Sequence, residues 1–173
     1  MTTKAQGAAT ENEFVISRTF NAPRELVWKM FTDPAHLSQW WGPKGFTVRL
    51  ANMDFRPGGI FHYCLRGPDG SDMWGRFAYR EITPPERIVY INSFSDESGG
   101  VARHPGHLAW PLEIFSVLTL AKAAGKTTLT LRWTPHNASA EEIKTFNDGM
   151  QSMTQGWTGT LDQLDAYLAK AQA

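Results

Sequence analysis

Apolar side chains recur at intervals of three and four residues near the end of the chain, over residues 140–169. This spacing places them on one face of an α-helix, in which about 3.6 residues complete a turn. We therefore predict one long helix over 140–169. Methionine adapts to irregular space and tryptophan offers a large flat surface, so the stripe suits either a packed core or the wall of a ligand site. The stripe consists of Ile143, Phe146, Met150, Met153, Trp157, Leu161, Leu164 and Leu168.

Segments with the alternation typical of β-strands precede that helix. The first covers residues 13–20, and two short helices are expected after it. Asn21 is the predicted N-cap of the first helix, with Pro23 in its first turn, and Asp33 is expected to open the second. Turns rich in Gly, Pro and Asp separate the later segments. Six further strands are predicted over residues 46–50, 59–66, 73–82, 87–94, 112–121 and 126–134.

This order of elements predicts an α+β fold in which an antiparallel sheet carries its helices on one side. Successive side chains of a strand point to opposite faces, so one set of aromatic residues faces the long helix. Flat rings opposite a stripe of Met and Trp favour an enclosed ligand space, and a solid aromatic-rich core is the alternative. The predicted ligand-binding residues are Phe61, Tyr63, Phe77, Tyr79, Phe115, Trp133, Met150, Met153 and Trp157.

The composition restricts the classes of function. Basic and acidic residues number 17 each and form no charged run, so neither nucleic acid nor an anionic membrane surface is an expected partner. The single cysteine, Cys64, lies in a strand-like run, where we expect a structural role in a reducing, cytoplasmic setting. No apolar run is long enough for a membrane span, and the first dozen residues lack the apolar stretch of a signal peptide. Residues 1–12 are small and polar and are predicted to form a disordered tail before one domain over residues 13–173.

Candidate metal ligands are few in this sequence. His104 and His107 are three residues apart in the long Gly-, Ser- and Pro-rich segment 95–111, and no other Cys or His lies near them along the chain. A zinc site needs three or four ligands with closed geometry. We therefore predict no metal site and no cofactor.

One carboxylate is a weak candidate for acid/base chemistry. Glu81 shares strand parity with Phe77 and Tyr79, and a carboxyl group that faced the pocket with them would have a raised pKa suited to proton transfer. At the end of its strand, Glu81 is equally able to pair with Arg80 or Arg87 or to meet water. We therefore assign no catalytic residue, and an enzymatic role stays open as the less favoured interpretation.

Short motifs follow one another in an order typical of one family. Residues 16–23 lead to Val27 and Trp28, and Thr32-Asp33-Pro34 is followed by the aromatic and glycine-rich run 40–46. Further matching segments are 57–59, 66–70, 75–82, 84–90 and 156–164. Together these motifs resemble the START-like helix-grip superfamily, also called SRPBCC, and within it bacterial proteins related to the activator of the heat-shock protein 90 ATPase. The resemblance covers residues 14–168.

The resemblance implies a curved antiparallel sheet wrapped around a long C-terminal α-helix, with a cavity between them for a hydrophobic or aromatic small molecule. Members of the superfamily include carriers of lipids and plant metabolites, aromatase/cyclases and co-chaperones, so the fold alone does not assign a reaction. Binding of a hydrophobic small molecule is the leading hypothesis. The alternatives are a co-chaperone-like domain that stimulates a chaperone ATPase and a cyclase- or hydrolase-type enzyme. The sequence leaves monomer and homodimer open.

Overall fold

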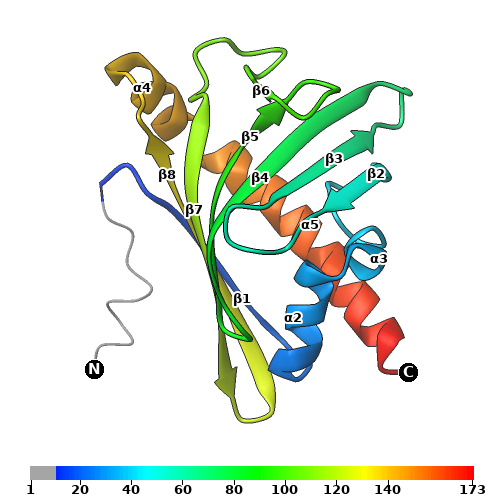
Figure 1. Ribbon diagram of the computed structural model, residues 1–173. Helices are drawn as coiled ribbons and strands as arrows, with labels where there is room; N and C mark the ends of the chain where they lie inside the picture. The colour runs from blue at the N-terminus through cyan, green and yellow to red at the C-terminus, as the bar shows by residue number, and fades with distance from the viewer. Residues whose placement is uncertain (1–10) are drawn as a thin grey trace.

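A curved antiparallel sheet wraps around one long helix, α5 (Met150–Ala171), in the computed structural model, which describes residues 11–173 (Figure 1). The strands of the described chain follow the order β1-β8-β7-β5-β4-β3-β2, and β6 pairs with β5. Every pairing is antiparallel, so the predicted α+β helix-grip fold is confirmed. The strands are β1 (Phe14–Phe20), β2 (Thr47–Met53), β3 (Ile60–Arg66), β4 (Asp72–Thr83), β5 (Arg87–Ser95), β6 (Val101–Ala102), β7 (Glu113–Ala123) and β8 (Lys126–His136).

The predicted tail, residues 1–12, lies outside the described residues except for its last two members. Glu11 and Asn12 form a turn, and the side chain of Asn147 donates a hydrogen bond of 2.9 Å to Asn12 Oδ1. The strand predictions are confirmed to within a few residues, with β7 and β8 running two residues farther than expected. The short strand β6 is an addition, because two residues carry no recognisable alternation.

Two short helices follow β1, as predicted, and their capping differs from the prediction at one position. Helix α2 (Arg24–Thr32) has Pro23 at its N-cap, in extended geometry and without a side-chain cap, so the capping role predicted for Asn21 was wrong. Helix α3 (Pro34–Leu37) begins as expected, because Asp33 Oδ1 accepts a hydrogen bond of 2.9 Å from the backbone N–H of Ala35.

The predicted single helix over 140–169 is two helices. Helix α4 (Ala140–Asp148) begins with a capping box in which Ser139 and Glu142 satisfy each other's backbone N–H groups. Gly149 ends it with φ −93° and ψ 8°, and α5 starts at the next residue. The apolar stripe runs through the break without losing its period, which is why the spacing predicted continuity. A Cβ at position 149 would approach the Trp110 ring to 3.3 Å, so the break also admits that ring.

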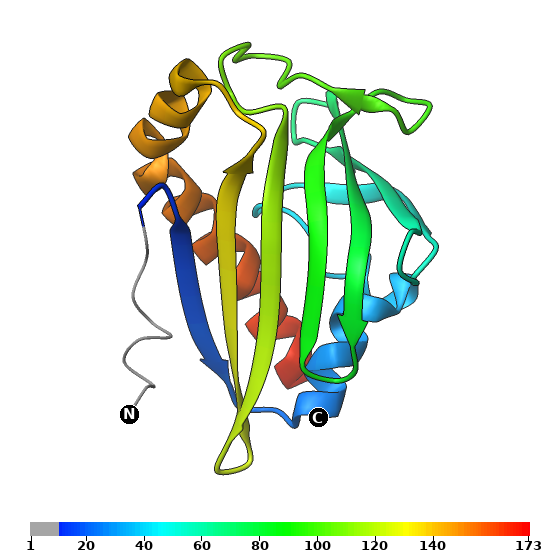
Figure 2. The ribbon, with the colours of Figure 1, turned by 60° about the vertical axis from the view of Figure 1, so that its left-hand side comes forward.

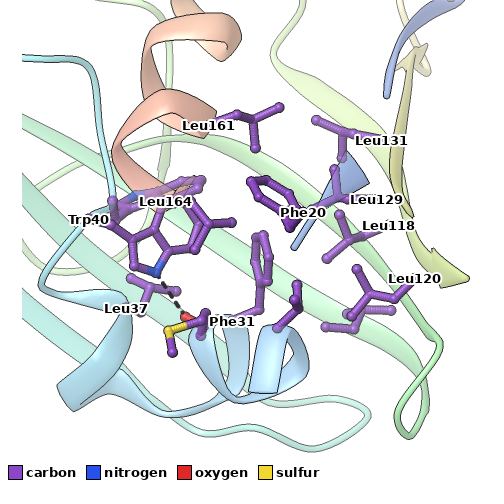
Figure 3. Close-up of a cluster of buried hydrophobic side chains, with 14 of the residues drawn as sticks. Phe20, Phe31, Leu37, Trp40, Leu118, Leu120, Leu129, Leu131, Leu161 and Leu164 are labelled. Carbon is purple, nitrogen blue, oxygen red and sulfur yellow. Dashed lines mark hydrogen bonds between the residues drawn. The ribbon is translucent and has the colours of Figure 1, made fainter. Parts of the chain in front are cut away.

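The main hydrophobic core lies between the C-terminal half of α5, the two short helices and the sheet (Figure 3). Leu161 and Leu164 of α5 are fully buried there, together with Phe20 at the end of β1. Trp40 is enclosed in the same cluster, and its indole N–H donates a hydrogen bond of 3.2 Å to the carbonyl of Met30. A smaller cluster of Phe14, Ile114, Phe146 and Met153 lies at the other end of α5.

The segment between β5 and β7 crosses the end of the sheet at which β8 passes into α4 (Figure 2). This arrangement leaves the N-terminal part of α5, the α4–α5 junction and that segment facing one another across the concave side of the sheet. Cys64 lies fully buried in β3, and burial raises the pKa of its thiol, in keeping with a structural role. Among the described helices, none is long and apolar enough to cross a membrane.

Candidate ligand-binding cavity

A cavity of about 670 Å³ lies between the concave face of the sheet and the junction of α4 and α5. Strands β3, β4, β5, β7 and β8 provide its floor, and the segment between β6 and β7 forms its roof. Its lining residues are Tyr63, Met73, Asn92, Ser93, Phe94, His104, His107, Trp110, Pro111, Ile114, Trp133, Thr145, Asp148, Gly149, Ser152 and Met153.

The floor on the β3 side depends on a glycine. Tyr63 lies opposite Gly75 in the β3–β4 register, and a Cβ at position 75 would come within 2.4 Å of the Tyr63 ring. The ring therefore occupies the space that a side chain at position 75 would fill if that residue were not glycine. Trp41 packs edge-on against it with ring centroids 5.7 Å apart. Burial raises the pKa of the Tyr63 phenol, so the hydroxyl stays protonated at neutral pH.

On the β5–β8 side, a row of polar atoms lies beneath aromatic rings. Ser116 is fully buried, lies between Tyr90 and Trp133 in the strand register, and donates a short hydrogen bond to Asn92 Oδ1. Burial raises the pKa of Tyr90, an effect that the neighbouring Trp133 and Ser116 partly oppose. The amide nitrogen of Asn92 donates no hydrogen bond to any described residue, so it remains available to a molecule in the cavity.

The indole N–H groups of Trp41 and Trp133 are buried, and neither forms a well-aligned hydrogen bond within residues 11–173. Each lies close to a tyrosine hydroxyl, Trp41 to Tyr63 and Trp133 to Tyr90, and each holds the pKa of that hydroxyl slightly lower than burial alone does. These two contacts give each indole N–H a polar neighbour, and aromatic packing holds the rings of Trp41 and Trp133 in place.

The roof is held by rings and one ion pair. His104 packs against Phe94 with ring centroids 4.6 Å apart, and its Nδ1 accepts a hydrogen bond of 2.9 Å from the backbone of Gly106. The neutral ring therefore carries its proton on Nε2. Partial burial, with a smaller contribution from the nearby His107, lowers the pKa of His104 and favours this neutral form. Arg103 forms an ion pair with Glu142 of α4, which connects the roof to that helix.

Trp110 closes the inner side of the roof. Its ring packs against Phe146 of α4 with centroids 5.6 Å apart and lies over Gly149. The mouth of the cavity is polar. Asp148 and Ser152 are exposed at its rim, and Lys144 pairs with Asp148 at 2.8 Å.

A second hollow of about 220 Å³ adjoins the first along α5. Tyr63, Trp133 and Met153 line both spaces. The other residues around the second hollow are Trp41, Gly42, Pro43, Leu65, Gly156, Trp157 and Thr160.

The structure brings only part of the predicted ligand-binding set to these spaces. Tyr63, Trp133 and Met153 line both hollows, and Trp157 lines the second. The remaining residues lie elsewhere. Phe61, Phe77 and Tyr79 are buried in the main core, Met150 packs beside the smaller cluster, and Phe115 lies on the opposite sheet face against His136.

Sequence reasoning did not select most of the residues that line the cavity, among them His104, Trp110 and Asn92. His104 and Trp110 belong to the long loop 95–111, whose length and aromatic content were the available signal. Asn92 is a polar residue on a buried strand face, and no sequence pattern marks it.

Glu81 lies away from both hollows. The β4–β5 register shifts between Tyr79 and Glu81, so the strict alternation on which the prediction rested ends just before this residue. Glu81 is 60% exposed and lies 3.9 Å from Arg87, in agreement with the alternative interpretation from the sequence. Within residues 11–173, no group of three or more His, Cys, Asp or Glu side chains is arranged to hold a metal ion.

The sequence matches the family model described as activator of Hsp90 ATPase homolog 1-like protein over residues 21–169. The chain belongs to this family. The match confirms the predicted resemblance to the helix-grip superfamily, whose fold often binds ligands in a cavity. A comparison with curated proteins finds no match.

Solved structures from several bacteria share the family's fold. A protein of Mycobacterium smegmatis is 26% identical, with a TM-score of 0.74 and 92% of each chain covered. A solution structure from Arthrobacter aurescens is also 26% identical, with a TM-score of 0.77 over 92% of this chain and 87% of the other. The AHSA1 protein of Silicibacter pomeroyi is 20% identical, with a TM-score of 0.71 over 92% and 99%, and that similarity concerns the fold alone.

Proposed function

We propose that the protein binds a small, mainly apolar molecule in the cavity between its sheet and the α4–α5 junction. The observation that carries the proposal is the cavity of about 670 Å³ itself. Binding sites for organic molecules typically measure about 300–1,000 Å³, and most of their lining is hydrophobic and aromatic with a few polar groups. The lining here has that character, with Tyr63, Phe94, Trp110 and Trp133 as walls and Asn92 among the polar groups.

The tyrosines and the carboxylate at the cavity support binding more than acid/base catalysis. Tyr63 in the lining and Tyr90, which neighbours Trp133 and Ser116, have raised pKa values and stay protonated. Asp148, the carboxylate among the lining residues, is exposed at the rim and paired with Lys144. General acid/base catalysis favours groups whose pKa lies near the working pH and that reach the reacting atoms.

A fluorescent probe tests the proposal directly. N-Phenyl-1-naphthylamine is uncharged and becomes fluorescent in apolar sites, so titration should give saturable binding to the wild-type protein. Ser152→Phe places a ring at the mouth of the cavity, whereas Gln151→Phe places one on the neighbouring exposed position. We expect weaker binding only in the Ser152 variant. Absence of saturable binding to the wild type, or equal effects of both substitutions, would contradict the proposal.

Native mass spectrometry of protein purified from its own host complements the probe. A co-purifying small molecule that dissociates on competition with the probe would identify the natural ligand. A cytoplasmic location remains a prediction from the sequence, which leaves monomer and homodimer open. The same native mass spectrum measures the oligomeric state.

The family match favours a second candidate, a co-chaperone-like domain that stimulates a chaperone ATPase. Leu50, Val101 and Leu108 are the large hydrophobic side chains exposed in the described chain, and they come from three separate segments. Scattered exposed apolar residues do not mark a protein interface. An ATPase assay with the host's Hsp90 homologue decides this candidate, and no stimulation at saturating protein excludes it.

A further inference from the structure

The two hollows beside α5 meet along shared side chains. Tyr63, Trp133 and Met153 border both of them. Trp157 lies between Trp41 and Trp133, with ring centroids 5.6 and 5.7 Å away, and extends the aromatic wall from the first hollow into the second. The combined space therefore follows the axis of α5 and is longer than either hollow.

The side chains that separate the hollows differ in their freedom to move. The Tyr63 ring is seated on Gly75, and Trp133 packs against both Phe14 and Trp157. Met153 packs in the smaller hydrophobic cluster, and its side chain has three rotatable bonds that let it adapt to a neighbour's shape. A rotamer change at Met153 is the simplest way to join the two spaces.

The chemical character of the two hollows is different. The lining of the first includes several polar side chains, whereas the second is lined mainly by rings, proline, leucine, methionine and glycine. Tyr63 and Thr160 carry the hydroxyls of its lining, and Thr160 donates to the carbonyl of Gly156 at 3.0 Å. The nearby loop is held by Gln163, whose amide donates to Gly42 O at 2.8 Å. The surface of the second hollow is almost entirely apolar, so it favours apolar groups.

The polar groups of the first hollow carry little charge. Its lining contains no lysine or arginine, and its single carboxylate, Asp148, is paired with Lys144. Asn92 Nδ2 and the Nε2–H of His104 are donors without a partner among the described residues. These donors suit an uncharged acceptor such as a carbonyl or hydroxyl oxygen, whereas a carboxylate would lack a cation to offset its desolvation.

We propose that the ligand is an elongated amphiphile with an uncharged oxygen-bearing head and an unbranched apolar tail. The head lies in the first hollow near Asn92 and His104, and the tail passes Met153 into the second hollow beside Gly156. This proposal rests on the proposed binding function and specifies the class of molecule that the same site takes.

Calorimetric titration with 2-alkanones of increasing chain length tests the proposal, and carboxylates of equal length serve as charged competitors. We expect affinity to rise about fourfold for each added methylene until the second hollow is full. The ketones should bind at least tenfold more tightly than the matching carboxylates.

Two substitutions on the same helix separate the tail site from general effects. At Gly156 and Gly159, a Cβ would meet no atom within 4 Å, so leucine at either position is compatible with folding. Only Gly156 lines the second hollow. Gly156→Leu should abolish the affinity gained by long chains and leave short chains unaffected, whereas Gly159→Leu should behave as wild type.

The outcomes distinguish failure of this inference from failure of the proposed function. Short and long ketones that bind with equal affinity, or a Gly156→Leu protein that binds long chains like wild type, would overturn the tail site while binding itself stands. Tighter binding of carboxylates would overturn the uncharged head. If no member of either series binds the wild-type protein and the naphthylamine probe also fails, both proposals are wrong.

Discussion

The ring of Tyr63 lies over the backbone of Gly75 on the neighbouring strand, at a distance that leaves no room for a Cβ on residue 75. The ring is thereby drawn down into the floor of the cavity instead of standing in its centre. The part of the cavity above β3 and β4 therefore depends on the pairing of the large Tyr63 side chain with a glycine, which has no side chain.

Gly75→Ala should destabilise the protein and reduce the cavity, because the new methyl group would sit 2.4 Å from the Tyr63 ring and push it upward. Overpacking of this kind typically costs about 1–3 kcal/mol. The free energy of unfolding from urea denaturation measures the loss. Tyr63→Leu in the Gly75→Ala background should recover part of it, and no recovery would show that the strain lies elsewhere.

Trp110→Ala should weaken binding of the naphthylamine probe several-fold and leave the fold intact. The ring closes the roof against Phe146 and Gly149, so its loss opens the cavity to water. Leu108→Ala provides the control, since Leu108 is in the same loop and is 75% exposed. Equal affinities of the two variants would mean that Trp110 does not enclose the ligand.

The ion pair between Arg103 and Glu142 should make the free energy of unfolding of the protein decrease as the pH falls into the acid range. Hydrogen bonds from the Ser139 backbone and from Arg103 lower the pKa of the Glu142 carboxyl below its ordinary value of 4.5. A lowered pKa in the folded state stabilises the protein above the unfolded value, and this contribution disappears as the pH falls through the folded value. Glu142→Gln keeps the capping geometry and removes the charge.

The difference in stability between wild type and Glu142→Gln should therefore be present near neutral pH and vanish in acid below the ordinary carboxyl pKa of 4.5. Urea denaturation at a series of pH values measures it. A difference that stays constant with pH would show that the charge of Glu142 contributes nothing to the fold.

Glu81→Gln should leave both stability and probe binding unchanged. The side chain is 60% exposed and its ion pair with Arg87 is long, at 3.9 Å. Exposed pairs of this kind contribute less than about 1 kcal/mol. A loss of binding in this variant would mean that the carboxylate reaches the ligand despite its position at the end of β4.

Periodicity and turn residues were sufficient to predict the α+β class and the order of the main elements, because the longer strands alternate and the turns contain residues that few other conformations favour. The family resemblance supplied the curved sheet around the long helix. The break at Gly149 escaped prediction for a physical reason. A glycine inside a helix costs only about 1 kcal/mol relative to alanine, so its presence did not outweigh an uninterrupted apolar stripe. The contact with Trp110, which comes from a loop far away in sequence, accompanies the break in the folded chain.

The candidate site was predictable only in part. Strand parity correctly directed Tyr63 toward α5, but parity gives the face of a sheet and not the position along it. Tyr79 shares that face and is buried in the main core, at the end where Phe55 and Tyr90 pack against it. Phe115 was predicted on the face toward α5, but it lies on the opposite face of the sheet. In β7 the even-numbered residues, such as Ile114 and Leu118, are the buried ones.

Helix α5 has two parts along its length, one that packs in the main core and one that lines the hollows. Its last turns hold Leu161, Leu164 and Leu168 in the main core, whereas its first turns supply Met153 and Gly156 to the hollows. Residues that secure the fold are thus largely separate from those that line the two hollows. Substitutions in the first turns can change the shape of the hollows while the leucines of the last turns continue to hold sheet and helix together, so the interior space can diverge on a constant scaffold.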